Sequence, residues 1–316
     1  MNNLNLKNMF PDDLIITNYK NGNTNVTIYG NGTKIREIPD NEIPNPKFPE
    51  SIDFKITNYC DLGCPYCHEN SNTKGKHASI NNILNILNPL PSGIELALGG
   101  GNPLSHPDIF NLLYKLKEKG FITNMTINYK HIKPFWNIIK TIFDNNLIYG
   151  LGISISSNYD PDIITEINML SPNIVYHIII GVNDPKDIVI LHSYDNNAKF
   201  LLLGYKQYGR GAMYYSNYTK KMINRWKLDV SDYLGNFNLS FDNLAIKQLN
   251  LKKYFTIEGW KQFYMGDDFT FTMYVDAVNK FYAPTSHHIA TERVSIDAMD
   301  VIDYFQNFKK LGNIMN

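Results

Sequence analysis

From Ser51 onward, short apolar runs alternate with amphipathic stretches, and this alternation restricts the fold more than any other feature of the 316-residue chain. The apolar runs predict strands near residues 51–57, 93–98, 121–127, 149–155, 174–180 and 198–203. Apolar residues at helical spacing, such as Ile80, Ile83 and Leu87, predict helices between them. Strands that alternate with helices pair in parallel through right-handed crossovers. The pattern therefore predicts an α/β fold, either a doubly wound sheet or a barrel.

The first predicted strand runs directly into all three cysteines of the chain, Cys60, Cys64 and Cys67. Their C-x3-C-x2-C spacing places three thiols on one loop at the end of a strand. Three thiolates held this closely can each bind one iron of a cubane cluster, whereas the usual [4Fe-4S] cluster takes four cysteine ligands. One iron would then be left without a protein ligand.

Two other uses of these cysteines fit less well. A structural zinc site could combine them with His68, but small zinc modules take a second ligand pair from a separate turn, and the chain has no second pair. Disulfide bonding would leave one thiol over and would need a secretory signal, which the first 13 residues do not resemble. A zinc-binding module without catalytic activity remains the remote alternative.

With Tyr66 directly before the third cysteine, the loop resembles the cluster-binding loop of radical S-adenosylmethionine (radical SAM) enzymes. This resemblance implies a [4Fe-4S] cluster on Cys60, Cys64 and Cys67, with S-adenosylmethionine bound at the open iron. It also implies the fold, a partial (β/α)6 TIM-like barrel, here with an N-terminal hairpin and a C-terminal α+β extension. In such barrels, ligands gather at the carboxyl ends of the strands.

The resemblance also implies the residues that contact the cofactors. Gly99-Gly100-Gly101-Asn102-Pro103 is similar to the family's Gly-Gly-Glu-Pro motif, with Asn102 in place of the acid, which removes the negative charge opposite the cosubstrate's ammonium group. Polar or strand-end residues on the later strands are the further candidates. The expected contacts to S-adenosylmethionine are Tyr66, Gly100, Gly101, Asn102, Asn128, Ser154, Ser156, His177 and Leu203. For His177, a role as a satisfied core histidine is the competing interpretation.

Two polar segments are candidates for substrate contact. His68 and Glu69 follow the last cysteine and are the candidate catalytic residues, with a solvated loop as the alternative. Lys206 and Arg210, just beyond the sixth strand, are candidates for holding an anionic group of the cosubstrate or substrate.

Three regions are expected along the chain. Residues 1–50 form a hairpin, 25–29 with 33–38, and a proline-rich lead-in; residues 51–204 form the core barrel; residues 205–316 form a capping or substrate region without cluster ligands. A second hairpin, 269–276 with 280–283, and a final helix carrying Ile296, Met299, Ile302 and Phe305 on one stripe are expected in the third region.

Composition limits the partners. Lys+Arg and Asp+Glu both number 30, and without a basic patch we expect no nucleic-acid partner. Apolar stretches stay below the length of a membrane span, so we expect no membrane association and a cytoplasmic protein with reduced thiols. The resemblance implies an electron donor such as flavodoxin or ferredoxin. The C-terminal region favours a peptide or protein as substrate, with a nucleotide or small metabolite as the alternative.

Overall fold

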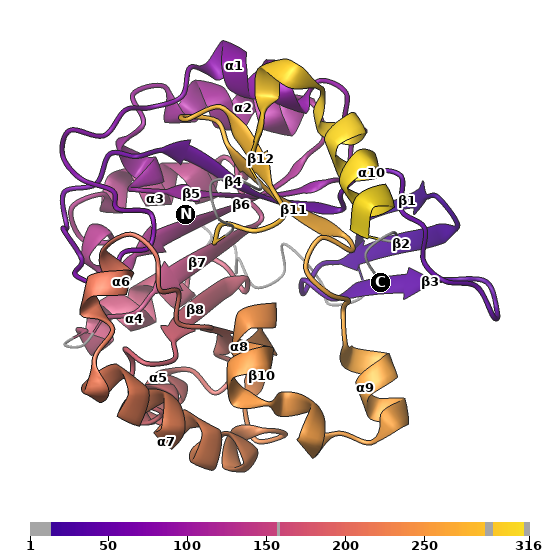
Figure 1. The fold of residues 1–316 in the computed structure, drawn as a ribbon. Coiled ribbons are helices and arrows are strands. Elements are labelled where there is room, and N and C mark those ends of the chain that lie inside the picture. Colours follow the sequence, from indigo (N-terminus) through magenta and orange to yellow (C-terminus); the bar gives the residue numbers. More distant parts are fainter. Residues whose placement is uncertain (1–13, 157–158, 288–292, 313–316) are drawn as a thin grey trace.

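The computed structural model describes residues 14–156, 159–287 and 293–312 (Figure 1). Six parallel strands stand side by side in chain order: β4 (Ser51–Thr57), β5 (Glu95–Gly100), β6 (Ile122–Asn128), β7 (Gly150–Ser154), β8 (Ile174–Ile179) and β9 (Lys199–Leu203). All six strands predicted from the sequence are confirmed. The helices between them are α1 (Ile80–Leu87), α2 (Ile109–Glu118), α3 (Trp136–Asp144), α4 (Pro161–Asn168) and α5 (Lys186–Tyr194).

These helices lie around the outside of the curved strands, as Figure 1 shows. The order of β4 to β9 follows the chain without the reversal that a doubly wound sheet has, and the sheet does not close, so the predicted partial barrel is confirmed and the doubly wound alternative is wrong. Each strand is followed by a helix on the outer side of the sheet, and the next strand pairs beside the previous one. The carboxyl ends of all six strands, and the loops that follow them, are thereby brought to one end of the barrel.

The two faces of the curved sheet differ in character. Side chains that point outward, such as Ile52, Phe54 and Ile56 on β4, are fully buried under the helices. Side chains that point inward alternate with them and are partly accessible, as the burial pattern of β6 to β9 shows. The inward face carries polar residues from neighbouring strands, among them Asp53, Asn124, Ser154 and His177. We call the space enclosed by this inward face the lumen.

A small antiparallel sheet covers the amino-terminal ends of the barrel strands. Its strands are β1 (Ile15–Asn21), β2 (Thr24–Tyr29) and β3 (Lys34–Glu37). The hairpin predicted for this region is β2–β3 and is confirmed, whereas β1 was not predicted. Lys34 forms an ion pair with Glu95 at the start of β5, and Lys199 at the start of β9 donates a hydrogen bond to the carbonyl of Asn31 over 2.8 Å.

The C-terminal region adds strands to both edges of the six-stranded sheet. It contains α6 (Arg210–Tyr214), α7 (Asn217–Tyr233), β10 (Asn238–Phe241), α8 (Asn243–Leu249), α9 (Ile257–Phe263), β11 (Thr272–Asp276), β12 (Phe281–Ala283), β13 (Val294–Ser295) and α10 (Val301–Gly312). β10 pairs in parallel with β9, and β11 pairs in parallel with β4. The predicted hairpin 269–276 with 280–283 is confirmed as β11–β12.

The predicted final helix is correct in its second half only. Ile296 begins a 3-10 turn and Met299 follows that turn, so the helix α10 starts at Val301. The reason is Asp300, whose carboxylate accepts hydrogen bonds from the amides of Ile302 and Asp303 and thereby caps the helix at that point. Among the described residues, no helix has the length and apolar character needed to cross a membrane.

Candidate active site

The cysteine loop leaves the carboxyl end of β4 and is folded back on itself by its own backbone. The amide of Cys60 donates to the carbonyl of Asn72 over 3.0 Å, and the amide of Cys67 donates to the carbonyl of Cys64 over 3.2 Å. All three thiols are free and partly buried. Burial, together with the neighbouring thiols, raises the thiol pKa of Cys64, and burial raises that of Cys60.

The spacing of the three sulfur atoms bears on the two metal sites that the sequence allowed. Tetrahedral zinc with sulfur at about 2.3 Å would bring its sulfur ligands to within about 4 Å of one another. In the described residues, the three sulfurs do not all lie within 4.8 Å of one another. A cubane requires a wider spacing because each thiolate binds a different iron. Among the described residues, the three thiols are therefore not gathered around one point in the way that a single zinc ion would need, and none is in a disulfide.

The loop is also fixed from its far side by His131, which the sequence analysis did not single out. His131 follows β6 and is buried, and its Nε2 lies 2.8 Å from the Oδ1 of Asp61. That hydrogen bond lowers the pKa of the Asp61 carboxyl. Cys60, Asp61 and His131 come within 4.8 Å of one another, so the loop is held against the end of β6 as well as β4.

The glycine run at the end of β5 provides the surface on which the cysteine loop rests. The amide of Gly101 donates to Thr57 and that of Asn102 to Tyr59, over 2.8 and 2.7 Å. A Cβ on Gly101 would lie 2.0 Å from the carbonyl oxygen of Tyr59, and Gly100 has a φ of +112°. Glycine is required at these two positions because the backbones touch and because the φ is positive.

Asn102, which stands where the related motif has an acid, is fully buried. Its Oδ1 accepts a hydrogen bond from the amide of Leu104, and its Nδ2 donates to Ser105 over 2.8 Å. The side chain thus stabilises the turn that follows the glycine run. A contact between Asn102 and a cosubstrate stays a prediction.

The remaining expected cofactor residues gather at the same end of the barrel. Ser154 on β7, His177 on β8 and Leu203 on β9 occupy partly accessible inward positions. Gly152 makes room for His177, since a Cβ there would lie 2.5 Å from the imidazole ring. Burial lowers the pKa of His177 to about 4, so its ring is neutral at pH 7.

Three further predicted residues differ in their surroundings. The hydroxyl of Ser156 is buried and has no hydrogen-bond partner among the described residues. The Oδ1 of Asn128 accepts a hydrogen bond from the amide of Lys130 and so caps a turn. Tyr66 packs edge-on against Tyr214 with ring centres 5.7 Å apart, and burial raises its pKa to about 12.

Comparison with known proteins agrees with this geometry. Residues 54–188 match the family model described as the radical SAM superfamily. The chain carries a radical SAM domain.

Solved structures extend the likeness in fold beyond this domain. The structure of SuiB from Streptococcus suis bound to the precursor peptide SuiA superposes with a TM-score of 0.64 at 14% identity, covering 94% of this chain and 88% of that one. The structure of SuiB bound to S-adenosylmethionine gives 0.62 at 13% identity, covering 93% and 87%. A search of the curated proteins found no match.

A radical SAM domain implies a [4Fe-4S] cluster and S-adenosylmethionine as cofactors. Three observations agree with these groups: three free thiols on one loop, a neutral imidazole beside Gly152, and a Ser156 hydroxyl that has no partner among the described residues. The thiolates of Cys60, Cys64 and Cys67 would hold the cluster.

The candidate catalytic residue Glu69 is engaged in a buried charge network. Its Oε2 accepts from Nζ of Lys55 over 2.5 Å, and its Oε1 accepts from the hydroxyl of Tyr274 over 3.0 Å. Lys55 also pairs with Asp276 over 3.1 Å. Burial lowers the pKa of Lys55, but the two carboxylates outweigh burial and raise it. Because its oxygens are already bonded, Glu69 anchors the cysteine loop to β4 and β11.

His68, the second candidate catalytic residue, retains more freedom. Its side chain is partly accessible, and its Nε2 lies 3.5 Å from Glu69. Burial, with Lys206 and Lys55 nearby, lowers its pKa well below the ordinary value, so the ring is neutral at pH 7.

The two cations expected to hold an anion have different positions. Lys206 interacts electrostatically with Asp53, His68 and His177, which places it at the lumen, and its Nζ donates to Ser286 over 2.8 Å. Arg210 differs from the expectation, because its guanidinium donates to backbone carbonyls of the cysteine loop. These bonds use the N–H groups of Arg210 that an anionic ligand would need.

Proposed function

We propose that this radical SAM enzyme modifies a peptide or protein. The observation that carries the proposal is the likeness in fold to peptide-bound SuiB over 94% of this chain, which includes the region after β9. A fold shared over that length extends to the segments that surround the lumen as well as to the cluster-binding core. We assign residues 51–204 to the core and residues 205–316 to substrate binding.

A cluster held by Cys60, Cys64 and Cys67 would supply the electron for reductive cleavage of S-adenosylmethionine, and the cosubstrate would supply the group that abstracts hydrogen from the substrate. The protein's part is to bind, orient and exclude water. Gly100 and Gly101 set the height of the cysteine loop above the lumen through their contacts with Thr57 and Tyr59. Ser156 and His177 present neutral hydrogen-bonding groups toward the cosubstrate, and His68 is placed to meet the substrate.

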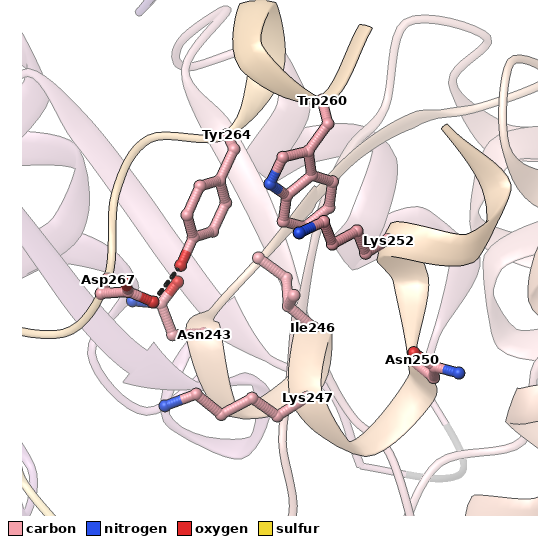
Figure 2. A pocket seen from close by; sticks show the side chains of 8 residues that line it. All are labelled: Asn243, Ile246, Lys247, Asn250, Lys252, Trp260, Tyr264 and Asp267. Atoms are coloured by element: carbon pink, nitrogen blue, oxygen red, sulfur yellow. Dashed lines mark hydrogen bonds between the residues drawn. The ribbon is translucent and has the colours of Figure 1, made fainter. Parts of the chain in front are cut away.

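The C-terminal region offers features that suit an extended substrate. β10 pairs with β9 on one side, and no described strand pairs with its other side, so its backbone is open to a peptide added as a further strand. A cavity of about 310 Å³ lies between α8 and α9. Figure 2 shows Trp260 and Tyr264 facing Ile246 and Lys247 across it.

This cavity has the chemistry of a side-chain pocket. The rings of Trp260 and Tyr264 are stacked with centres 4.6 Å apart, and Nζ of Lys252 lies 5.9 Å from the Trp260 ring centre. Aromatic walls with a polar rim suit one side chain of a peptide. We also propose that the enzyme receives its electrons from a donor such as flavodoxin or ferredoxin and that it acts in the cytoplasm.

Transfer of deuterium tests the proposal. Active enzyme would be incubated separately with uniformly deuterated peptides, nucleotides and small metabolites, and the 5′-deoxyadenosine formed would be examined by mass spectrometry. We expect deuterium in 5′-deoxyadenosine from the peptide pool. If the 5′-deoxyadenosine gained deuterium from nucleotides or metabolites and none from peptides, peptide modification would be wrong and the substrate would be a nucleotide or small metabolite.

A further inference from the structure

The segment that follows β9 packs directly on the cysteine loop, about 140 residues away in the sequence. The amide of Arg210 donates to the carbonyl of Cys67 over 3.0 Å. A Cβ on Gly209 would lie 2.5 Å from the carbonyl oxygen of His68, and Gly209 has a φ of +54°. Glycine at position 209 therefore allows the two backbones to touch.

The side chain of Arg210 reaches further into the same loop. Its Nε donates to the carbonyl of Cys64 over 2.9 Å, and its Nη1 donates to the carbonyl of Ser71 over 2.9 Å. The same Nη1 lies 3.2 Å from the Oδ1 of Asn70. One guanidinium thus bridges the two ends of the stretch that holds Cys64 and Cys67, and the planar group suits several acceptors at once.

The positive charge of Arg210 lies within electrostatic range of the thiols. The Nε of Arg210 lies 2.9 Å from the carbonyl oxygen of Cys64, and its own amide lies 3.0 Å from that of Cys67, so the guanidinium is held against the backbone that carries two of the three thiols. The other charged groups that act on the thiols of Cys60 and Cys64 are Asp61 and Lys130. The reduction potential of an iron–sulfur cluster depends on nearby charge and hydrogen bonding, and a cation favours the reduced, more negative form.

We propose that Arg210 is a positioning residue for the cluster, which fixes the cysteine loop through its carbonyl groups and raises the cluster's reduction potential through its charge. This role does not depend on which substrate the enzyme uses. It also makes the region after β9 part of the cluster site, although that region contains no cysteine.

Arg210→Gln and Arg210→Lys test the two parts of the proposal, with Arg225→Gln as the matched control. Arg225 lies in α7 and pairs with Asp184 and Asp229, away from the cysteine loop. Hydrogen exchange of the apoprotein, read by mass spectrometry over residues 60–72, reports on the loop without any cluster. Loss of the charge-assisted bonds should speed exchange there about tenfold in Arg210→Gln and leave Arg225→Gln unchanged.

Redox titration of the reconstituted proteins, followed by electron paramagnetic resonance, tests the charge. The midpoint potential should become more negative in Arg210→Gln and return toward the unsubstituted value in Arg210→Lys, which keeps the charge but not the fork of donors. If Arg210→Gln does not assemble a cluster, the exchange measurement on its apoprotein still tests the positioning role, and the midpoint potential of Arg210→Lys tests the charge. Unchanged exchange over residues 60–72 in Arg210→Gln overturns the positioning role. A midpoint potential that is unchanged in Arg210→Gln, or one in Arg210→Lys that falls as far as in Arg210→Gln, overturns the electrostatic role.

Discussion

Lys55 is a buried cation shared between two buried carboxylates, those of Glu69 and Asp276. The three side chains are 5%, 12% and 1% exposed, so water cannot replace a lost partner. Lys55→Met should therefore lower the free energy of unfolding by about 3–5 kcal/mol, measured by urea denaturation of the apoprotein. The control is Lys140→Met in the exposed Lys140–Asp144 pair, which should cost less than about 1 kcal/mol. An effect of Lys55→Met no larger than that of the control would contradict this account of the network.

Asp53 should make the stability of the fold depend on pH. It stands on the inward face of β4, and partial removal of water raises its pKa from 3.8 to about 6, with Lys206 opposing and Glu69 and Asp242 adding to the shift. Because the folded-state pKa is the higher one, the folded chain binds the proton more tightly, and this contribution is lost as the pH rises through about 6. Asp53→Asn removes this loss of stability at high pH, because an amide does not ionise.

The gain in unfolding free energy from Asp53→Asn should therefore be larger at pH 8 than at pH 5. Urea denaturation of the apoprotein at both values measures it. Asp144→Asn, an exposed acid on α3, is the control and should show no such trend. A gain from Asp53→Asn that is the same at both pH values would show that Asp53 has an ordinary pKa.

The residues that sequence reasoning missed are those whose partners are distant in the chain. The alternation of β4 predicted a buried Ile52, Phe54 and Ile56, and the structure confirms these. Lys55 meets Asp276 only because β11 pairs with β4 in a register that sets Asp276 opposite Lys55. No local pattern determines that register. Arg210 was singled out as a cation, but its partners are carbonyl groups, which no sequence pattern reveals.

At the scale of elements, the contact between β5 and the cysteine loop gives a matched pair of substitutions. In Gly101→Ala the new Cβ would lie 2.0 Å from the carbonyl of Tyr59, whereas in Gly99→Ala it would have no neighbour within 4 Å. Gly101→Ala should destabilise the protein by about 1–3 kcal/mol and reduce iron retention. Gly99→Ala should keep both the stability and the iron content of the unsubstituted protein, measured by denaturation and iron assay. Equal losses in the two variants would indicate that backbone freedom, and not the close contact, is what matters.

The elements predicted from the sequence are those with strong periodicity. The six barrel strands and the helices between them have it, and all were found. β10 was missed because its four residues, Asn238–Phe241, are too short for an alternation to be recognised. α7 was missed although Met222, Trp226 and Val230 are buried at helical spacing. The division of the chain at residues 50 and 204 stays a prediction.

At the scale of the whole molecule, the cysteine count limits the metal content. The chain has three cysteines, and all lie on the loop after β4. Because thiolates are the usual ligands of iron–sulfur clusters, we expect one cluster and about four irons per chain. Iron and sulfide analysis of the anaerobically reconstituted protein, supported by Mössbauer spectroscopy, measures this. A content well above four irons per chain would mean that the C-terminal region binds a further cluster through other ligands.

The most direct test of the account is the cleavage of S-adenosylmethionine by the reduced, reconstituted protein. We expect 5′-deoxyadenosine from the unsubstituted chain. Cys60→Ala, Cys64→Ala and Cys67→Ala should each abolish it, because each thiolate holds a different iron. The exposed Lys140→Met variant should retain it. Formation of 5′-deoxyadenosine that survives all three cysteine substitutions, or a colourless protein that binds one zinc and forms none, would contradict the assignment of the cysteine loop as the site of this chemistry.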